Sequence, residues 1–205
     1  VQSAVLLLKF TNIEKRALIA LYNATDGPNW TNNTNWLSDK PLGQWYGISV
    51  STDGIFSINL SNNNLKGVLP KEIGDFASIK AMELSKNSLS GSIPPEIGNL
   101  LTVHNLFLND NHFTGEIPPE IGNLPLYTFY LSNNELSGSI PTEIFTIQTL
   151  GVFHLNNNQL SGGIPPGIEN LTRVSDINLS QNKLSGSLPP EIGSLPELAL
   201  LNLTG

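Results

Sequence analysis

A leucine that recurs about every 24 residues limits what this 205-residue chain can fold into more than any other feature. Successive members lie 24, 24, 23, 24, 24 and 24 residues apart. They are Leu60, Leu84, Leu108, Leu131, Leu155, Leu179 and Leu203. A fixed period of roughly 20–50 residues is typical of proteins built from stacked units, each of which buries its apolar face against its neighbours. The repeat therefore predicts a solenoid in which each unit forms one turn of a coil.

Four more positions recur in register with the leucine, in the order asparagine, glycine, proline and isoleucine. The asparagines are Asn63, Asn87, Asn111, Asn134, Asn158 and Asn182, and the glycines are Gly67, Gly91, Gly115, Gly138, Gly162 and Gly186. Alternating apolar residues such as Val103, Leu106 and Leu108 predict a short strand in each repeat. We expect the asparagine to bond backbone groups that the next turn leaves unpaired, and the glycine to allow a tight path. A glutamate after the proline, such as Glu96, is expected to begin a short helical turn.

Residues 174–189 read V-S-D-I-N-L-S-Q-N-K-L-S-G-S-L-P, which resembles the plant-type leucine-rich repeat, L-x-x-L-x-L-x-x-N-x-L-S-G-x-I-P-x-x-I-G-x-L. The resemblance covers about residues 53–205 and implies membership of a family that includes receptor-kinase ectodomains and polygalacturonase inhibitors. It implies an α/β solenoid, a right-handed coil with a concave parallel β-sheet and short 3-10 or helical turns on the convex side. We expect six full repeats and a truncated seventh in residues 53–205, after an N-terminal cap in residues 1–52.

The expected cap contains one amphipathic helix. Thr11 to Glu14 has the pattern of a capping box, which predicts that the helix begins there, and Gly27-Pro28 is expected to end it. The apolar residues of this helix share one face: Ile13, Ala17, Leu18, Leu21 and Ala24. The tryptophans of the chain all lie in the cap, at Trp30, Trp36 and Trp45. Because a cap must seal the open end of a solenoid, we expect them to pack rather than to form a carbohydrate platform.

The segment W-Y-G-I-S-V, residues 45–50, resembles the cap motif of plant repeat proteins, W-x-G-V-x-C. Val50 stands where that family has a cysteine, and Gly43 stands at the position of its usual partner. The cap disulfide that the family implies is therefore absent, as in cysteine-free caps of secreted microbial or algal repeat proteins. The sequence of residues 20–27, A-L-Y-N-A-T-D-G, also resembles these secreted proteins.

The repeat predicts which side chains form columns on the concave face of the sheet. The middle column reads Asn59, Glu83, Phe107, Tyr130, His154, Asn178 and Asn202, and the column before it reads Ser57, Ala81, Asn105, Thr128, Val152, Asp176 and Leu200. Phe107, Tyr130 and His154 are thus expected on consecutive strands of a face that is otherwise small and polar. Exposed aromatic rows are typical of binding surfaces, although cross-strand contacts could also serve only to stiffen the sheet. We predict a ligand-binding patch on these three residues, with a rim of Asn105, Thr128, Val152, Asp110 and Asp176.

Composition argues against several classes of function. The net charge is −7 and there is no basic cluster, so nucleic-acid binding is not expected. The longest apolar run near the start, residues 4–8, is too short to span a bilayer, so no membrane insertion is expected. The histidines His104, His112 and His154 have no second ligand at metal spacing, and the repeated glutamates are better explained by helix dipoles than by calcium. No nucleophile completes a catalytic set with His154 and Asp176, so we expect neither enzyme activity nor a cofactor.

These features predict an extracellular or cell-surface recognition module that binds a protein, peptide or glycan. Two alternatives stay open: a structural or adhesive surface protein that assembles end to end through its uncapped C-terminal repeat, and an inhibitor of a cell-wall hydrolase. Seven Asn-x-Ser/Thr sequons are candidate N-glycosylation sites. They are Asn23, Asn29, Asn32, Asn59, Asn170, Asn178 and Asn202.

Overall fold

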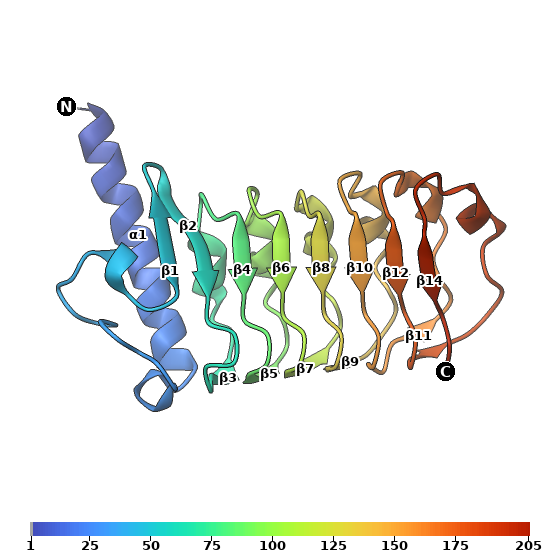
Figure 1. Ribbon diagram of the computed structural model, residues 1–205, viewed down its shortest axis with the longest axis horizontal. Coiled ribbons are helices and arrows are strands. Elements are labelled where there is room, and N and C mark those ends of the chain that lie inside the picture. The colour runs from blue at the N-terminus through green and yellow to red at the C-terminus, as the bar shows by residue number, and fades with distance from the viewer. Residues whose placement is uncertain (1) are drawn as a thin grey trace.

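The fold is a one-dimensional stack of repeats that begins with a helix, and Figure 1 shows the strands side by side along its long axis. It was determined as a computed structural model, which describes the backbone of residues 2–205 and the side chains of residues 12–205. Helix α1 spans Gln2–Ala24, and an antiparallel hairpin of β1 (Ile48–Ser51) and β2 (Gly54–Asn59) joins it to the repeats.

The main sheet has eight strands in the order β1-β2-β4-β6-β8-β10-β12-β14, and all pairs after β1–β2 are parallel. Its remaining strands are β4 (Ala81–Glu83), β6 (Asn105–Phe107), β8 (Thr128–Tyr130), β10 (Val152–His154), β12 (Asp176–Asn178) and β14 (Leu200–Asn202). Each strand from β4 to β12 buries its central residue, and the two flanking residues stay half-buried on the opposite face. This alternation is what the repeat spacing predicts, and the expected fold class is confirmed.

Short 3-10 turns lie behind the main sheet, on the convex side of the coil (Figure 1). They are η3 (Lys71–Asp75), η4 (Pro95–Asn99), η5 (Pro119–Asn123), η6 (Thr142–Thr146), η7 (Ile168–Asn170) and η8 (Pro190–Ser194). Each has a glutamate in its first turn, and five of these occupy the predicted repeat position, at Glu72, Glu96, Glu120, Glu143 and Glu191. The sixth, Glu169 in η7, lies two residues after Gly167, which interrupts the repeated glutamate position. Gly167 precedes η7 with φ 95°, and this turn is shorter than the other five.

Smaller sheets along one edge of the coil were not predicted from the sequence. Four of the contributing strands contain the repeated glycine and the other two end two residues before it, where we expected only a tight turn. One sheet contains β3 (Lys66–Val68), β5 (Ser88–Gly91), β7 (His112–Gly115) and β9 (Glu135–Leu136), and the other contains β11 (Ser161–Gly162) and β13 (Lys183–Leu184). The glycines themselves have positive φ, for example 72° at Gly91 and 78° at Gly115, as the tight path requires.

The repeated asparagine is the polar centre of each turn, as predicted. Asn111 donates from Nδ2 to the carbonyls of Leu84 and Leu108 at 3.0 and 3.1 Å, and its Oδ1 accepts from the N–H of Leu89 at 3.0 Å. Each amide therefore joins its own turn to the repeat before it. The carbonyls of Leu84 and Leu108 also accept from Asn87 and Asn134, at 3.0 and 3.1 Å, so the asparagines of successive repeats share these buried acceptors.

The cap packs as expected around its tryptophans. Trp30, Trp36 and Trp45 are buried, and each indole N–H donates to a backbone carbonyl at 2.8–3.2 Å. Neighbouring ring centroids lie 4.7 Å apart for Trp30–Trp36 and 5.2 Å apart for Trp36–Trp45. These rings form part of the core and are not available as a carbohydrate platform.

Two details of the cap can be compared with the sequence expectations. The predicted helix start at Thr11 is wrong, because α1 begins at Gln2, and Glu14 instead accepts from the N–H of Ile55 at 3.0 Å. A Cβ on Gly43 would lie 2.9 Å from Cγ2 of Val50, so the positions that resemble the family's cysteine pair are in contact without a disulfide. Packing of the side chains of residues 4–8 lies outside the described residues.

Candidate functional site

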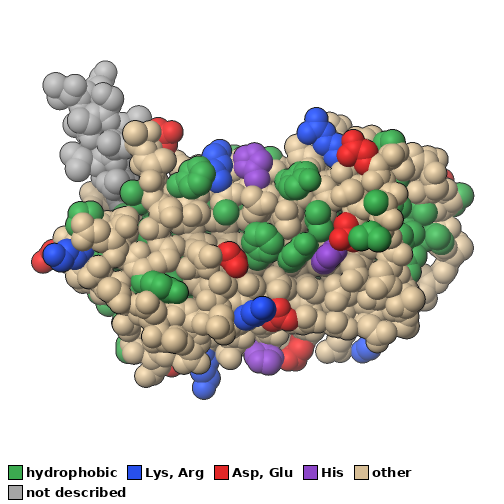
Figure 2. Space-filling model, viewed as in Figure 1, with side chains coloured by type: hydrophobic (Ala, Val, Ile, Leu, Met, Phe, Trp, Pro, Cys, Tyr) green, Lys and Arg blue, Asp and Glu red, His purple; other side chains and the backbone are tan. Residues whose placement is uncertain are grey.

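The predicted columns form because the main strands pair without a shift in register. Pairing of β6, β8, β10 and β12 places Phe107 beside Tyr130, Tyr130 beside His154, and His154 beside Asn178. The neighbouring column follows the same pairing: Asn105, Thr128, Val152 and Asp176. Figure 2 shows hydrophobic side chains gathered over the middle strands of this face, with histidine and acidic side chains beside them.

Phe107, Tyr130 and His154 form a continuous row, which we call the aromatic ladder. The Phe107 and Tyr130 ring centroids lie 5.2 Å apart with the planes at 84°, an edge-to-face contact. Tyr130 and His154 are stacked, with centroids 4.6 Å apart and planes only 3° from parallel. Each ring is half-buried by its neighbours, so the ladder is a pre-ordered surface and not three mobile side chains.

An acidic group lies at the end of the ladder. Asp176 Oδ2 is 2.9 Å from Nε2 of His154, as the adjacent strands suggested, but the contact does not have hydrogen-bond geometry, and this buried nitrogen has no hydrogen-bond partner among the described residues. Burial raises the pKa of Tyr130, and the negative charge of Asp176 raises it further. The carboxylate therefore influences the ring two strands away, which indicates that the ladder and Asp176 form one electrostatic unit.

The predicted rim residues lie in two different parts of the repeat, the strands and the turns that follow them. Asn105, Thr128 and Val152 are half-buried beside the ladder, on the same strands. Asp110 lies beyond the end of β6, in a turn where its φ is 57°. Its carboxylate accepts from the side-chain amides of Asn109 at 2.6 Å and Asn133 at 2.5 Å, so it already forms hydrogen bonds to side chains of its own turn and the next.

A second exposed column was missed by the sequence reasoning. It lies one residue before the rim column, where backbone hydrogen bonds join Phe56, Lys80, His104 and Tyr127 from repeat to repeat. Phe56 is 46% exposed and Tyr127 is 52% exposed. The same repeat register would have found this column, because each member follows the last by the repeat length.

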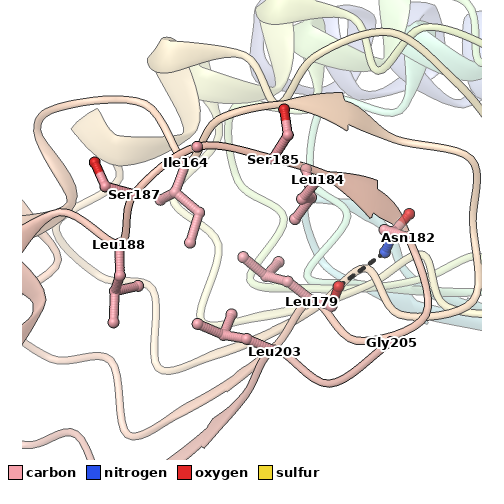
Figure 3. Close-up of a pocket in the computed structure, with 10 residues that line it drawn as sticks. Ile164, Leu179, Asn182, Leu184, Ser185, Ser187, Leu188, Leu203 and Gly205 are labelled. Carbon is pink, nitrogen blue, oxygen red and sulfur yellow. Dashed lines mark hydrogen bonds between the residues drawn. The ribbon is translucent and has the colours of Figure 1, made fainter.

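Another apolar surface lies at the C-terminal end of the coil. Figure 3 shows the side chains of Ile164, Leu184, Leu188 and Leu203 around a pocket there, with Asn182 donating to the carbonyl of Leu179 at 3.0 Å. Leu188, Leu200 and Leu201 are exposed at this end.

The seven sequons differ in accessibility. Five of the asparagines are exposed, namely Asn23, Asn29, Asn59, Asn170 and Asn202. Asn32 and Asn178 are half-buried. Glycosylation at any of them stays a prediction.

The described residues contain neither a metal-binding cluster nor a helix of the membrane-spanning kind. Among them, no group of three or more His, Cys, Asp or Glu side chains is arranged to hold a metal ion. Within the same part of the chain, no helix combines the length and the apolar character needed to cross a bilayer.

The chain is similar to known repeat proteins in sequence and in structure. The family model described as Leucine Rich Repeat matches six successive segments: residues 55–76, 78–100, 102–124, 125–147, 149–171 and 173–195. A probable leucine-rich repeat receptor-like protein kinase of Arabidopsis thaliana is 39% identical over 69 residues, which are 33% of this chain and 7% of that protein. The chain therefore spans a small part of that relative.

Solved structures give longer matches. The Arabidopsis receptor kinase HAESA, in complex with the peptide hormone IDA and the co-receptor SERK1, is 28% identical with a TM-score of 0.84, over 95% of this chain and 33% of that chain. The BIR2 ectodomain from Arabidopsis thaliana is 29% identical with a TM-score of 0.73, over 84% of this chain and 94% of that chain.

Proposed function

Because this chain belongs to the leucine-rich-repeat family, we propose that it is a non-enzymatic recognition module that binds a peptide or protein segment on the concave face of its main sheet. The observation that carries the proposal is the aromatic ladder of Phe107, Tyr130 and His154, which is ordered by ring contacts at 5.2 and 4.6 Å. The similarity to HAESA, a receptor solved with a peptide hormone, supports a peptide as the ligand class.

The shape of the surface favours an extended segment. The ladder crosses the parallel strands, which are about 4.8 Å apart, so its three rings span roughly 10 Å. Rigid aromatic side chains give contact area with little loss of conformational entropy, which is why they are typical interface anchors. The half-buried Asn105 and Thr128 beside them offer hydrogen-bonding groups to a ligand backbone. As the matched receptor chains are ectodomains, we also propose an extracellular or cell-surface location.

Selection of a random peptide library on the immobilised chain would test the proposal. The affinity of enriched peptides would then be measured by calorimetry for the wild type and for the double variant Phe107→Ser/Tyr130→Ser. Loss of two anchors is expected to weaken binding by about tenfold or more. The matched control is Phe56→Ser/Tyr127→Ser, which removes two exposed aromatic side chains from the second exposed column. Equal affinity for the wild type and the ladder variant, with the fold intact, would contradict the proposal.

A further inference from the structure

The aromatic ladder stops at β10, and its last ring has no ring beyond it. In the same column, the next strand carries Asn178. The Oδ1 of Asn178 accepts from the N–H and Oγ of Ser180 at 3.2 and 2.7 Å, so this short side chain is turned toward its own turn. The outer side of the His154 ring therefore faces a rung of the sheet that holds no aromatic group. We call this place the open rung.

The spacing of the ladder indicates what kind of group fits the open rung. Tyr130 and His154 stack with centroids 4.6 Å apart and planes at 3°, close to the roughly 4.8 Å between strands. One more planar group at the same spacing would lie over β12. It would then be beside Asp176, which occupies the neighbouring column of that strand.

The charge around the open rung favours a cation. Neither of the two columns on the concave face contains a lysine or arginine from Ser57 to Asn202. Residues 87–205 contain 2 Lys or Arg and 10 Asp or Glu. Asp176 makes its one ion-pair contact among the described residues with His154, at 2.9 Å, and this contact lacks hydrogen-bond geometry. The carboxylate thus keeps acceptor positions for a ligand.

We infer that the open rung binds the guanidinium of an arginine side chain in the ligand, stacked on His154 and paired with Asp176. This inference rests on the proposed function, because it names the chemistry of one residue in the proposed peptide. A guanidinium is planar, permanently charged and able to form two parallel hydrogen bonds to one carboxylate. It also stacks on aromatic faces, which a compact lysine ammonium does less well. Burial raises the pKa of Tyr130 and the negative charge of Asp176 adds to that effect; the same charge would stabilise the bound cation.

A titration with small probes tests the inference without a selected peptide. Bacterially expressed chain, which carries no N-glycan at Asn178, would be titrated with N-acetylarginine amide, the lysine analogue and the neutral isostere N-acetylcitrulline amide. Ring resonances of His154 and Tyr130 would be followed by NMR. We expect the arginine probe to bind most strongly, the lysine probe more weakly, and the citrulline probe at least about tenfold more weakly than arginine. Equal shifts with arginine and citrulline would overturn the inference.

Variants give a second measurement. Asp176→Asn keeps the shape of the side chain and removes its charge. It is expected to lower the affinity for the arginine probe by about tenfold. Glu135→Gln is the matched control. Glu135 also lies close to a histidine, with Oε1 3.4 Å from Nδ1 of His112, but it belongs to the smaller sheet that contains β9 and not to the main sheet. Unchanged arginine binding in the Asp176 variant, with unchanged thermal unfolding, would overturn the inference.

The two proposals fail in different ways. If selected peptides depend on Phe107 and Tyr130 but tolerate citrulline in place of arginine, the proposed function stands and the arginine site is wrong. If the selected peptides are insensitive to the ladder variant, the proposed function is wrong whatever the small probes show.

Discussion

At the scale of single residues, the buried asparagines are the polar contacts on which the stack depends. Asn134 donates from Nδ2 to the carbonyls of Leu108 and Leu131 at 3.1 and 3.0 Å, and its Oδ1 accepts from the N–H of Phe113 at 3.0 Å. Asn111 and Asn158 also donate to the carbonyls of Leu108 and Leu131, at 3.1 and 3.0 Å. Asn134→Ala would therefore remove one of two amide donors from each carbonyl and the side-chain acceptor of the Phe113 N–H, and is expected to lower the free energy of unfolding by about 1–3 kcal/mol. Urea unfolding would measure this. Asn123→Ala, at an exposed position, is the control; a similar loss in both variants would contradict the assigned role.

Glu14 predicts a pH dependence of stability. This carboxylate is 1% exposed, and burial raises its pKa above the ordinary value of 4.5 despite the hydrogen bond from Ile55. Since the folded state favours the protonated form, the contribution of Glu14 to stability is fully present below pH 4.5 and is lost as the pH rises through the raised pKa. Glu14→Gln does not titrate. The melting temperature of this variant relative to the wild type is therefore expected to increase from about pH 4 to about pH 7. An offset that stays constant over this range, or that the exposed Glu197→Gln reproduces, would contradict the assignment.

Single residues also show where sequence reasoning was adequate and where it was not. The places of Phe107, Tyr130 and His154 followed from counting, because equal repeats bring equal positions into one column. The hydrogen bonds of Asp110 could not be predicted by counting. Its partner Asn133 lies in the next repeat, and the contact requires the left-handed backbone of Asp110, whose φ is 57°. The helix start at Thr11 was wrong because a capping pattern is local, whereas Glu14 is held by Ile55, 41 residues away.

At the scale of elements, the contacts between successive 3-10 turns predict which glycines are required. A Cβ on Gly98, in η4, would lie 2.5 Å from Cβ and 2.7 Å from the carbonyl oxygen of Glu120 in the next turn. Gly193, in η8, has no atom within 4 Å of such a Cβ. Gly98→Ala is therefore expected to cost about 1–3 kcal/mol of stability. Gly193→Ala is expected to be neutral or to stabilise by about 0.4–1 kcal/mol, provided the backbone tolerates alanine. Denaturant midpoints would compare them, and equal effects would contradict the packing argument.

The main strands and 3-10 turns could be predicted from the sequence because their signals repeat: alternating apolar residues, then proline and glutamate. The edge sheets could not. Their strands are only two to four residues long and contain the repeated glycine or end two residues before it, and that glycine by itself indicates a turn. Hydrogen bonds between neighbouring repeats, such as that from the N–H of Ser88 to the carbonyl of Leu65 at 2.8 Å, order them as strands.

At the scale of the whole molecule, the fold converts a linear repeat into a continuous surface. Residues about 24 positions apart in sequence, such as Tyr130 and His154, come into ring contact because each repeat completes one turn. Changes in the solvent-facing columns alter this surface without altering the buried leucines behind it. We therefore expect a peptide to bind where the aromatic ladder crosses β6, β8 and β10.

Amide chemical-shift changes in the 22.2 kDa chain would locate a bound peptide directly. When a selected peptide is added, we expect the largest changes on residues of β6, β8, β10 and β12, and we expect these changes to vanish in Phe107→Ser/Tyr130→Ser. Changes confined to the 3-10 turns, the edge sheets or the cap would contradict it.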